Sequence, residues 1–184
     1  MDYFLKSSRL GFRCWEETDL SLAEDLWGNP AVTALIGGPF PPDIVRARLH
    51  SEIAQMRSFG VQYWPVFVRN GNRHCGCAGL RPYRIEDRIY ELGVHFLPAF
   101  WGRGLAQEAS RAVIDYAFGP LRANELFAGH HPENERSRQL LLKLGFVHTH
   151  EELYPPTGLQ HTSYSLRKKQ ELQVPILSRR LLAR

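Results

Sequence analysis

The chain has 184 residues, enough for one domain with a sizeable core, and 43% hydrophobic and 23% charged residues are typical of a soluble globular protein. No apolar run approaches the roughly 20 residues that span a bilayer, and residues 1–6 lack the pattern of a signal peptide, so we expect no membrane partner. The net charge of +4 lies partly in the basic C-terminal segment, and the near-neutral body argues against a nucleic-acid partner.

Cysteine usage indicates a reducing compartment. The three cysteines, Cys14, Cys75 and Cys77, form an odd set without the second pair that a zinc site of this kind requires. Cys75 and Cys77 would point the same way on a regular strand. We therefore expect reduced thiols, no metal and a cytoplasmic protein.

The first sixty residues read as a strand followed by two helices. Residues 10–15 alternate and predict a strand, and residues 20–27 predict a helix with a cap at Thr18-Asp19. Residues 31–36 are ambiguous. A longer helix opens at Pro41-Pro42-Asp43 and closes at Gly60, with apolar residues at helical spacing.

The rest of the chain alternates strands and helices. Asn70-Gly71-Asn72 predicts a tight hairpin, and Gly145 predicts the end of a helix. The expected strands are 63–68, 75–80, 90–97, 126–129, 146–150 and 163–167, and the expected helices are 106–118 and 134–144.

This order, β-α-α-β-β-β-α-β-α-β-β, predicts an α+β fold with a mixed, mostly antiparallel central sheet flanked by helices. We expect a single domain over residues 1–184, with a core at about 9–168. The tail, residues 169–184, stays without a predicted element; its apolar segments 174–177 and 181–182 are compatible with docking on a second copy as a homodimer.

The most informative stretch runs from Phe100 to Ala109, between a predicted strand and a predicted helix. Glycines at 102 and 104 allow the backbone to approach a ligand, and the first turn of the helix presents unpaired N–H groups to an anion. No P-loop motif occurs, and Gln107 stands in place of the third glycine of a dinucleotide fingerprint. A plain strand-to-helix turn would show the same two glycines.

Two motifs together resemble the GCN5-related N-acetyltransferase (GNAT) family. The cofactor loop of that family reads Gln/Arg-x-x-Gly-x-Gly/Ala, and Gly104 and Ala106 match its last fixed positions, although Trp101 stands where Gln or Arg is usual. Residues 134–146 resemble the family's Asn-x-x-Ser helix followed by Lys-Leu-Gly-Phe. The resemblance covers about residues 9–168, and the loop is most similar to the branch of the ribosomal-protein alanine acetyltransferases.

The resemblance implies the acyl-CoA N-acyltransferase fold and acetyl-CoA as co-substrate. It places the pantetheine arm against a strand, the pyrophosphate on the N–H groups of the loop, and an asparagine at the pantetheine end. The implied residues are Val94, His95 and Phe96 on the strand, Gly102, Arg103, Gly104, Leu105, Ala106 and Gln107 in the loop, and Asn134.

Three residues are candidates for the chemistry, which needs a proton acceptor for the amine and a proton for the leaving thiolate. Glu91, on the strand beside the cofactor, is a candidate base, or else a solvated or salt-bridged strand residue. His130 is a second candidate base, or a loop histidine bonded to the backbone or to solvent. Ser137 is the candidate near the sulfur, or a serine that serves helix N–H groups. The tyrosine that many family members use as an acid is absent, since Leu141 occupies that position.

The resemblance therefore implies an N-acetyltransferase that moves an acetyl group by direct transfer to a primary amine of a small molecule or a protein N-terminus. The segments 33–40, 83–88 and 154–161 would wall the acceptor site, and they carry few carboxylates. One alternative is a non-catalytic acyl-CoA-binding or regulatory module, which the leucine at 141 favours. Another is an unrelated nucleotide-binding protein with the same loop.

Overall fold

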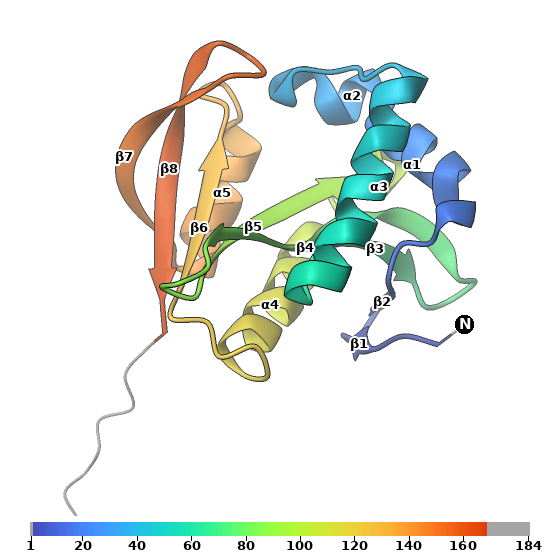
Figure 1. The fold of residues 1–184 in the computed structure, drawn as a ribbon, viewed down its shortest axis with the longest axis horizontal. Coiled ribbons are helices and arrows are strands. Elements are labelled where there is room, and N and C mark those ends of the chain that lie inside the picture. Colours follow the sequence, from blue (N-terminus) through green and yellow to red (C-terminus); the bar gives the residue numbers. More distant parts are fainter. Residues whose placement is uncertain (1, 169–184) are drawn as a thin grey trace, which may run out of the picture.

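The computed structural model describes residues 2–168, which form one eight-stranded sheet with helices on both faces (Figure 1). Short 3₁₀ turns lie at Glu17–Asp19, Ala34–Ile36 and Pro98–Phe100. The strands are β1 (Leu5–Lys6), β2 (Leu10–Phe12), β3 (Tyr63–Val68), β4 (Arg73–Arg84), β5 (Ile89–Phe96), β6 (Glu125–His130), β7 (Val147–Tyr154) and β8 (Leu159–Arg167). The helices are α1 (Leu20–Trp27), α2 (Pro30–Thr33), α3 (Pro42–Phe59), α4 (Leu105–Phe118) and α5 (Glu135–Leu144).

The strands are ordered β1-β2-β3-β4-β5-β6-β8-β7 across the sheet. Neighbouring strands are antiparallel except β5 and β6, which are parallel and joined by the crossover helix α4. This confirms the mixed, mostly antiparallel sheet that the order of elements predicts. Within residues 2–168, no helix is both long and apolar enough to cross a membrane.

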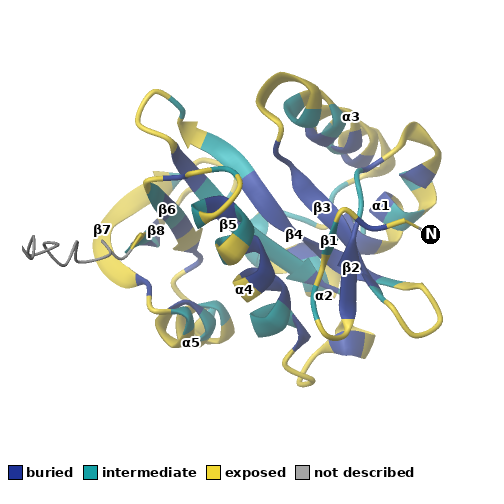
Figure 2. Ribbon diagram, turned by 90° about the horizontal axis from the view of Figure 1, so that it is seen from below, coloured by how far each residue is buried: buried dark blue, intermediate teal, exposed yellow. Residues whose placement is uncertain are grey.

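Two apolar clusters lie on opposite faces of the sheet. One packs α4 and the end of α5 against the strands, and the other packs α1 and α3 against them. Figure 2 shows α3 on one side of the sheet and α4 and α5 on the other. Strand β4 contributes to both clusters, so its central residues from Cys75 to Leu80 are all buried.

Cys75 and Cys77 belong to different clusters, so the expectation that they point the same way is wrong. Cys75 packs on the α4 side, whereas Cys77 packs on the α1–α3 side and its Sγ lies 3.6 Å from Nδ1 of His95. The cause is an irregularity in the β3–β4 pairing, where Gly76 has a φ of +151° and breaks the alternation of the strand. The thiols of Cys14, Cys75 and Cys77 are free.

The other elements follow the sequence closely. The hairpin at Gly71 and Asn72 has both residues at positive φ, as its sequence predicts. The ambiguous segment 31–36 forms the end of α2 and a 3₁₀ turn. Strand β1 was not predicted, β2 is shorter than predicted, and β4, β7 and β8 are longer than predicted. The tail 169–184 and its expected docking role lie outside the described residues.

Candidate active site

The sheet opens between β5 and β6. The two strands pair only over Ile89–Glu91 and Glu125–Phe127. Beyond these residues, β5 stays paired with β4 as far as Phe96, while β6 stays paired with β8 as far as His130. The backbone groups of β5 that point away from β4 therefore have no strand partner here, and an extended ligand can pair with them.

A loop with unpaired N–H groups lies at the end of this opening. Gly102 and Gly104 both have a φ of +72°, a left-handed conformation that favours glycine, and Gly104 is the N-cap of α4 without a side-chain cap. Among the described residues, the backbone N–H groups from Gly102 to Gln107 have no hydrogen-bond partner. Such a run at a helix N-terminus fits a pyrophosphate.

Glu108 fixes this loop to the N-terminal strands. Its carboxylate accepts hydrogen bonds from the hydroxyl of Ser7 at 2.7 Å and from the backbone N–H and Nε of Arg9 at 2.7 and 2.6 Å. Arg9 also donates from Nη1 to the carbonyl of Arg103 at 3.0 Å. Burial raises the pKa of Glu108, but these hydrogen bonds outweigh it and lower the pKa. The sequence does not predict this contact, and its only signal there is an acidic residue in the first turn of α4.

Trp101, which departs from the family motif, has a structural role of its own. Its indole N–H donates to the carbonyl of Phe96 at 2.6 Å, which ties the loop to the end of β5. The guanidinium of Arg136, on α5, lies over the indole ring at 5.1 Å from its centroid. The carbonyl of Phe96 is thus already used within the chain.

The residues of β5 alternate between the two faces of the sheet at the opening. Val94 and Phe96 pack on the side of α4. His95 points to the side of α1, where its Nδ1 accepts a hydrogen bond from the indole of Trp27 at 3.3 Å. Glu91 has the parity of His95 and therefore lies on the same face. We call this the acceptor face, defined by Glu91 and His95 and the side chains around them.

Glu91 is half-buried and lies beside a cluster of charged and polar groups. Its neighbour Glu52 is fully buried, forms an ion pair with Arg81 and accepts a hydrogen bond from the backbone N–H of Tyr63 at 2.8 Å. The guanidinium of Arg81 lies 4.2 Å from the centroid of the Tyr63 ring. Burial raises the pKa of Glu91, and Arg81 and the hydroxyl of Tyr63 oppose this in part. A carboxylate with a raised pKa is better suited to accept a proton from an amine.

His95 is uncharged at neutral pH. Burial is the main cause that holds the pKa of His95 well below its usual value, and the positive charges of Arg48 and Arg81 add to it. Its Nδ1, which accepts from Trp27, carries the lone pair, so Nε2 carries the proton. The imidazole is therefore a fixed neutral group beside Glu91.

His130 is buried on the α4 side and engaged within the chain. Its Nδ1 donates to the carbonyl of His131 at 2.7 Å, and its Nε2 accepts from the hydroxyl of Tyr164 at 3.4 Å. His131 in turn accepts the backbone N–H of Glu133 at 3.1 Å. These contacts match the interpretation of backbone-bonded histidines, and they place His130 on the opposite face from Glu91.

Asn134 and Ser137 lie at the start of α5. The Oδ1 of Asn134 accepts the backbone N–H of Ser137 at 3.1 Å, so Asn134 caps the helix and its amide group remains available. Among the described residues, no group bonds the hydroxyl of Ser137. The helix N–H groups are thus served by Asn134 and not by Ser137. Leu141 is buried in the core.

Two of the three segments expected to wall the acceptor site, 33–40 and 154–161, touch each other. A Cβ on Gly37 would lie 2.9 Å from the carbonyl oxygen of Pro156, so the turn after α2 touches the β7–β8 hairpin. The rings of Tyr83 and Phe127 stack at 4.2 Å between centroids. Sequence analysis missed Glu52 and Arg81; the signal for Glu52 is an acidic residue on the apolar stripe of α3.

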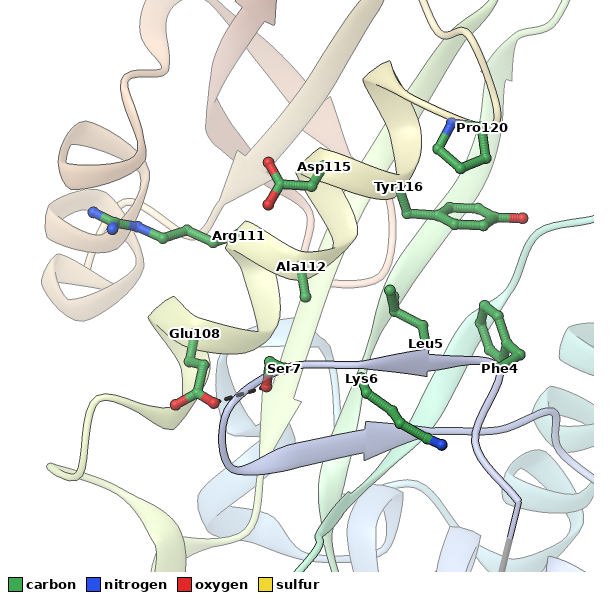
Figure 3. A pocket seen from close by; sticks show the side chains of 10 residues that line it. All are labelled: Phe4, Leu5, Lys6, Ser7, Glu108, Arg111, Ala112, Asp115, Tyr116 and Pro120. Carbon is green, nitrogen blue, oxygen red and sulfur yellow. Dashed lines mark hydrogen bonds between the residues drawn. The ribbon is translucent and has the colours of Figure 1, made fainter.

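A separate hollow of about 560 Å³ lies between β1 and α4 (Figure 3). Its wall includes the hydrogen bond between Ser7 and Glu108 that fixes the loop. Arg111 and Asp115 add charges of opposite sign to the same wall. The hollow therefore belongs to the support of the loop. Within residues 2–168, no three His, Cys, Asp or Glu side chains gather as ligands for a metal ion.

Comparison with known proteins identifies the class that this fold and opening define. Residues 9–147 match the family model described as Acetyltransferase (GNAT) domain. The chain belongs to the GNAT acetyltransferase family, whose members use acetyl-CoA as co-substrate, and it is an N-acetyltransferase.

Individual relatives agree with this assignment. The chain is 30% identical over 145 residues to the uncharacterized N-acetyltransferase p20 of Bacillus licheniformis, covering 77% of this chain and 81% of the relative. A GNAT-family acetyltransferase from Bacillus anthracis superposes with a TM-score of 0.76 at 21% identity, over 89% of this chain and 97% of the other. A protein described as a putative ribosomal-protein-serine acetyltransferase from Vibrio cholerae superposes with a TM-score of 0.77 at 18% identity, over 91% and 98%. At these identities the superpositions show the acyl-CoA N-acyltransferase fold.

Proposed function

We propose that the chain transfers an acetyl group from acetyl-CoA directly to a primary amine of a small molecule or of a protein N-terminus. One observation carries the proposal: the sheet opens between β5 and β6 toward the unpaired N–H groups of the loop, and Glu91 lies at the point where the opening begins. The opening fits an extended arm, and the loop fits the phosphates at its end.

The residues present fit acetyl-CoA in three places. The backbone of Val94, His95 and Phe96 forms the edge of β5 along which the pantetheine arm would lie. The carbonyl of Phe96 is not available to this arm, because it accepts the hydrogen bond from Trp101. Gly102, Arg103, Gly104, Leu105, Ala106 and Gln107 offer N–H groups to the pyrophosphate. Asn134 offers its amide N–H to the pantetheine end, since its oxygen caps α5.

Glu91 is the proposed base. The amine nitrogen gives a proton to the Glu91 carboxylate, directly or through a water, and bonds to the acetyl carbon while the bond from that carbon to sulfur breaks. The sulfur leaves as a thiolate, which the hydroxyl of Ser137 stabilises by a hydrogen bond. His130, bonded to Tyr164 on the other face, is the second candidate for proton transfer.

The test measures binding and turnover separately. Calorimetry should show acetyl-CoA binding and no comparable binding of ATP or NAD, and an assay of free thiol should show release of CoA with members of a panel of amines and peptides. No binding at millimolar acetyl-CoA contradicts the proposal. Binding without thiol release from any acceptor would favour the non-catalytic module.

We also propose that the protein acts in the cytoplasm, which its free cysteines support. A protein as acceptor is supported by the neighbour from Vibrio cholerae, which is described as a putative ribosomal-protein-serine acetyltransferase. Expression with fractionation, and mass spectrometry of N-terminal peptides after incubation with acetyl-CoA, would check the two statements.

A further inference from the structure

Arg48, on the inner side of α3, is the group on the acceptor face that the chemistry above does not use. Its guanidinium lies over the rings of Trp27 and Phe40, at 4.9 and 5.5 Å from their centroids. Its Nε is buried and has no hydrogen-bond partner. Among the described residues, no carboxylate forms an ion pair with Arg48.

The neighbouring carboxylates do not neutralise this charge. Glu52 forms its ion pair with Arg81, and among the described residues no ion pair joins Glu91 to Arg48. Burial lowers the pKa of Arg48, and the charge of Arg81 adds to this effect, so an ionised Arg48 is destabilised where it lies. An unpaired, partly desolvated guanidinium is costly to a protein unless an anion joins it.

Arg48 also lies close to the reacting groups. Its positive charge acts to lower the pKa of Glu91, His95 and Tyr154, which come from β5 and β7 on either side of the opening. Trp27, which the guanidinium covers, is bonded to His95. An anion held by Arg48 would therefore lie on the same face as an amine that gives its proton to Glu91.

We propose that Arg48 binds a carboxylate of the acceptor, so that the acceptor is an amine that also carries a carboxylate, as an amino acid does. This rests on the proposed function. A guanidinium matches a carboxylate in a two-point, planar contact, and one uncompensated positive charge matches a singly charged carboxylate better than a doubly charged phosphate. The acceptor face would then bind both charged ends of the substrate, the amine at Glu91 and the carboxylate at Arg48.

The test compares acceptors that differ only in this carboxylate: glycine with glycinamide, alanine with alaninamide, and glutamine with its α-carboxamide. In the native protein, kcat/KM should favour the acids by about tenfold or more, as expected for a charged hydrogen-bonded pair. In Arg48→Met the ratio should fall toward one, and in Arg48→Lys it should be intermediate. Each pair is compared across proteins, so differences in amine basicity cancel.

Arg46→Met is the matched control, because Arg46 is an exposed arginine on the same helix. It should keep the native ratio of acid to amide. Arg48→Met should also unfold at the same or a higher temperature, because it removes an unpaired, partly desolvated charge, so a lost preference cannot be ascribed to misfolding.

Two results would overturn the inference. One is an acid-to-amide ratio that Arg48→Met leaves unchanged; the other is a ratio that Arg46→Met lowers as much as Arg48→Met does. If none of these acceptors turns over, calorimetry of the same pairs with the CoA-loaded protein decides: acids that bind no better than amides contradict it. Failure of the protein to bind acetyl-CoA at all would instead remove the proposed function, so the two failures are distinguishable.

Discussion

The loop from Trp101 to Gln107 and the acceptor face around Glu91 present different groups to their ligands. The loop presents backbone N–H groups, whose direction is set by glycines at positive φ. The acceptor face presents charged side chains from α3, β4 and β5, of which Glu52 is buried and the others are half-buried. The loop therefore tolerates changes of side chain, such as Trp101 in place of Gln or Arg, whereas the chemistry of the acceptor face depends on the identity of each residue.

The largest expected effect tests the acceptor face. Glu91→Gln removes the proposed base while keeping the size of the side chain, so kcat should fall by about 100-fold or more, and the affinity for acetyl-CoA should stay the same. Because burial raises the pKa of Glu91, native kcat/KM should rise as the pH rises through that raised pKa. In the variant, this rise of kcat/KM with pH should be absent.

The control for this variant is Glu24→Gln, an exposed carboxylate on α1 that forms no ion pair among the described residues. It should leave both the rate and the pH profile unchanged. A Glu91→Gln variant with the native rate at all pH values would exclude Glu91 as the base and would direct attention to His130.

The second prediction tests the loop with a pair of glycines in matched conformations. Gly102 and Gly60 have φ values of +72° and +70°, and a Cβ on either would meet no atom within 4 Å. Alanine at each position should reduce the free energy of unfolding by about 1 kcal/mol through backbone strain. Only Gly102→Ala should also weaken acetyl-CoA binding, by about tenfold, since the strain is relieved when the loop leaves its binding conformation.

Calorimetry with CoA and thermal unfolding measure the two effects separately. Equal loss of CoA affinity in Gly60→Ala would mean that general destabilisation, and not the shape of the loop, controls binding. Neither variant should change the pH profile of kcat, because neither residue lies on the acceptor face.

The third prediction concerns the support of the loop. Glu108→Gln weakens the hydrogen bonds to Ser7 and Arg9 and should cost about 1 kcal/mol of stability at neutral pH. The folded-state pKa of Glu108 is lowered, so its contribution is present above the unfolded pKa and is lost as the pH falls through the folded pKa. The difference in unfolding free energy between the native protein and the variant should therefore vanish at low pH. A difference that persists in acid would show that packing, and not charge, supports the loop.

The same contrast explains what could be predicted from the sequence. The fold and the loop depend on local patterns: apolar spacing for α3, a hairpin motif at Asn70-Gly71-Asn72, and glycines between β5 and α4. These patterns lie within a few residues of each other, and the structure agrees with them. Strand β1 was not predicted because its two residues, Leu5 and Lys6, are too few to show the alternation of apolar and polar residues that marks a strand.

The acceptor face could not be predicted in this way. Arg48, Glu52 and Arg81 come together only when α3 packs on β4, and contacts over 29 residues leave no local pattern. The prediction that Cys75 and Cys77 point the same way was wrong for a related reason, because the irregularity at Gly76 arises from pairing with β3. Family resemblance supplied Glu91, but its partners required the structure.

The smallest expected effect separates two roles of one residue on the cofactor side. Asn134 caps α5 with its oxygen, and its amide N–H is the proposed donor to pantetheine. Asn134→Ser keeps a capping oxygen and removes the amide, so the unfolding temperature should change little while the affinity for CoA falls by about threefold. Asn134→Ala removes both groups and should lower stability by about 1 kcal/mol in addition. If Asn134→Ser binds CoA as tightly as the native protein, Asn134 is a helix cap alone, and the cofactor is held on this side by the backbone without any side chain of α5.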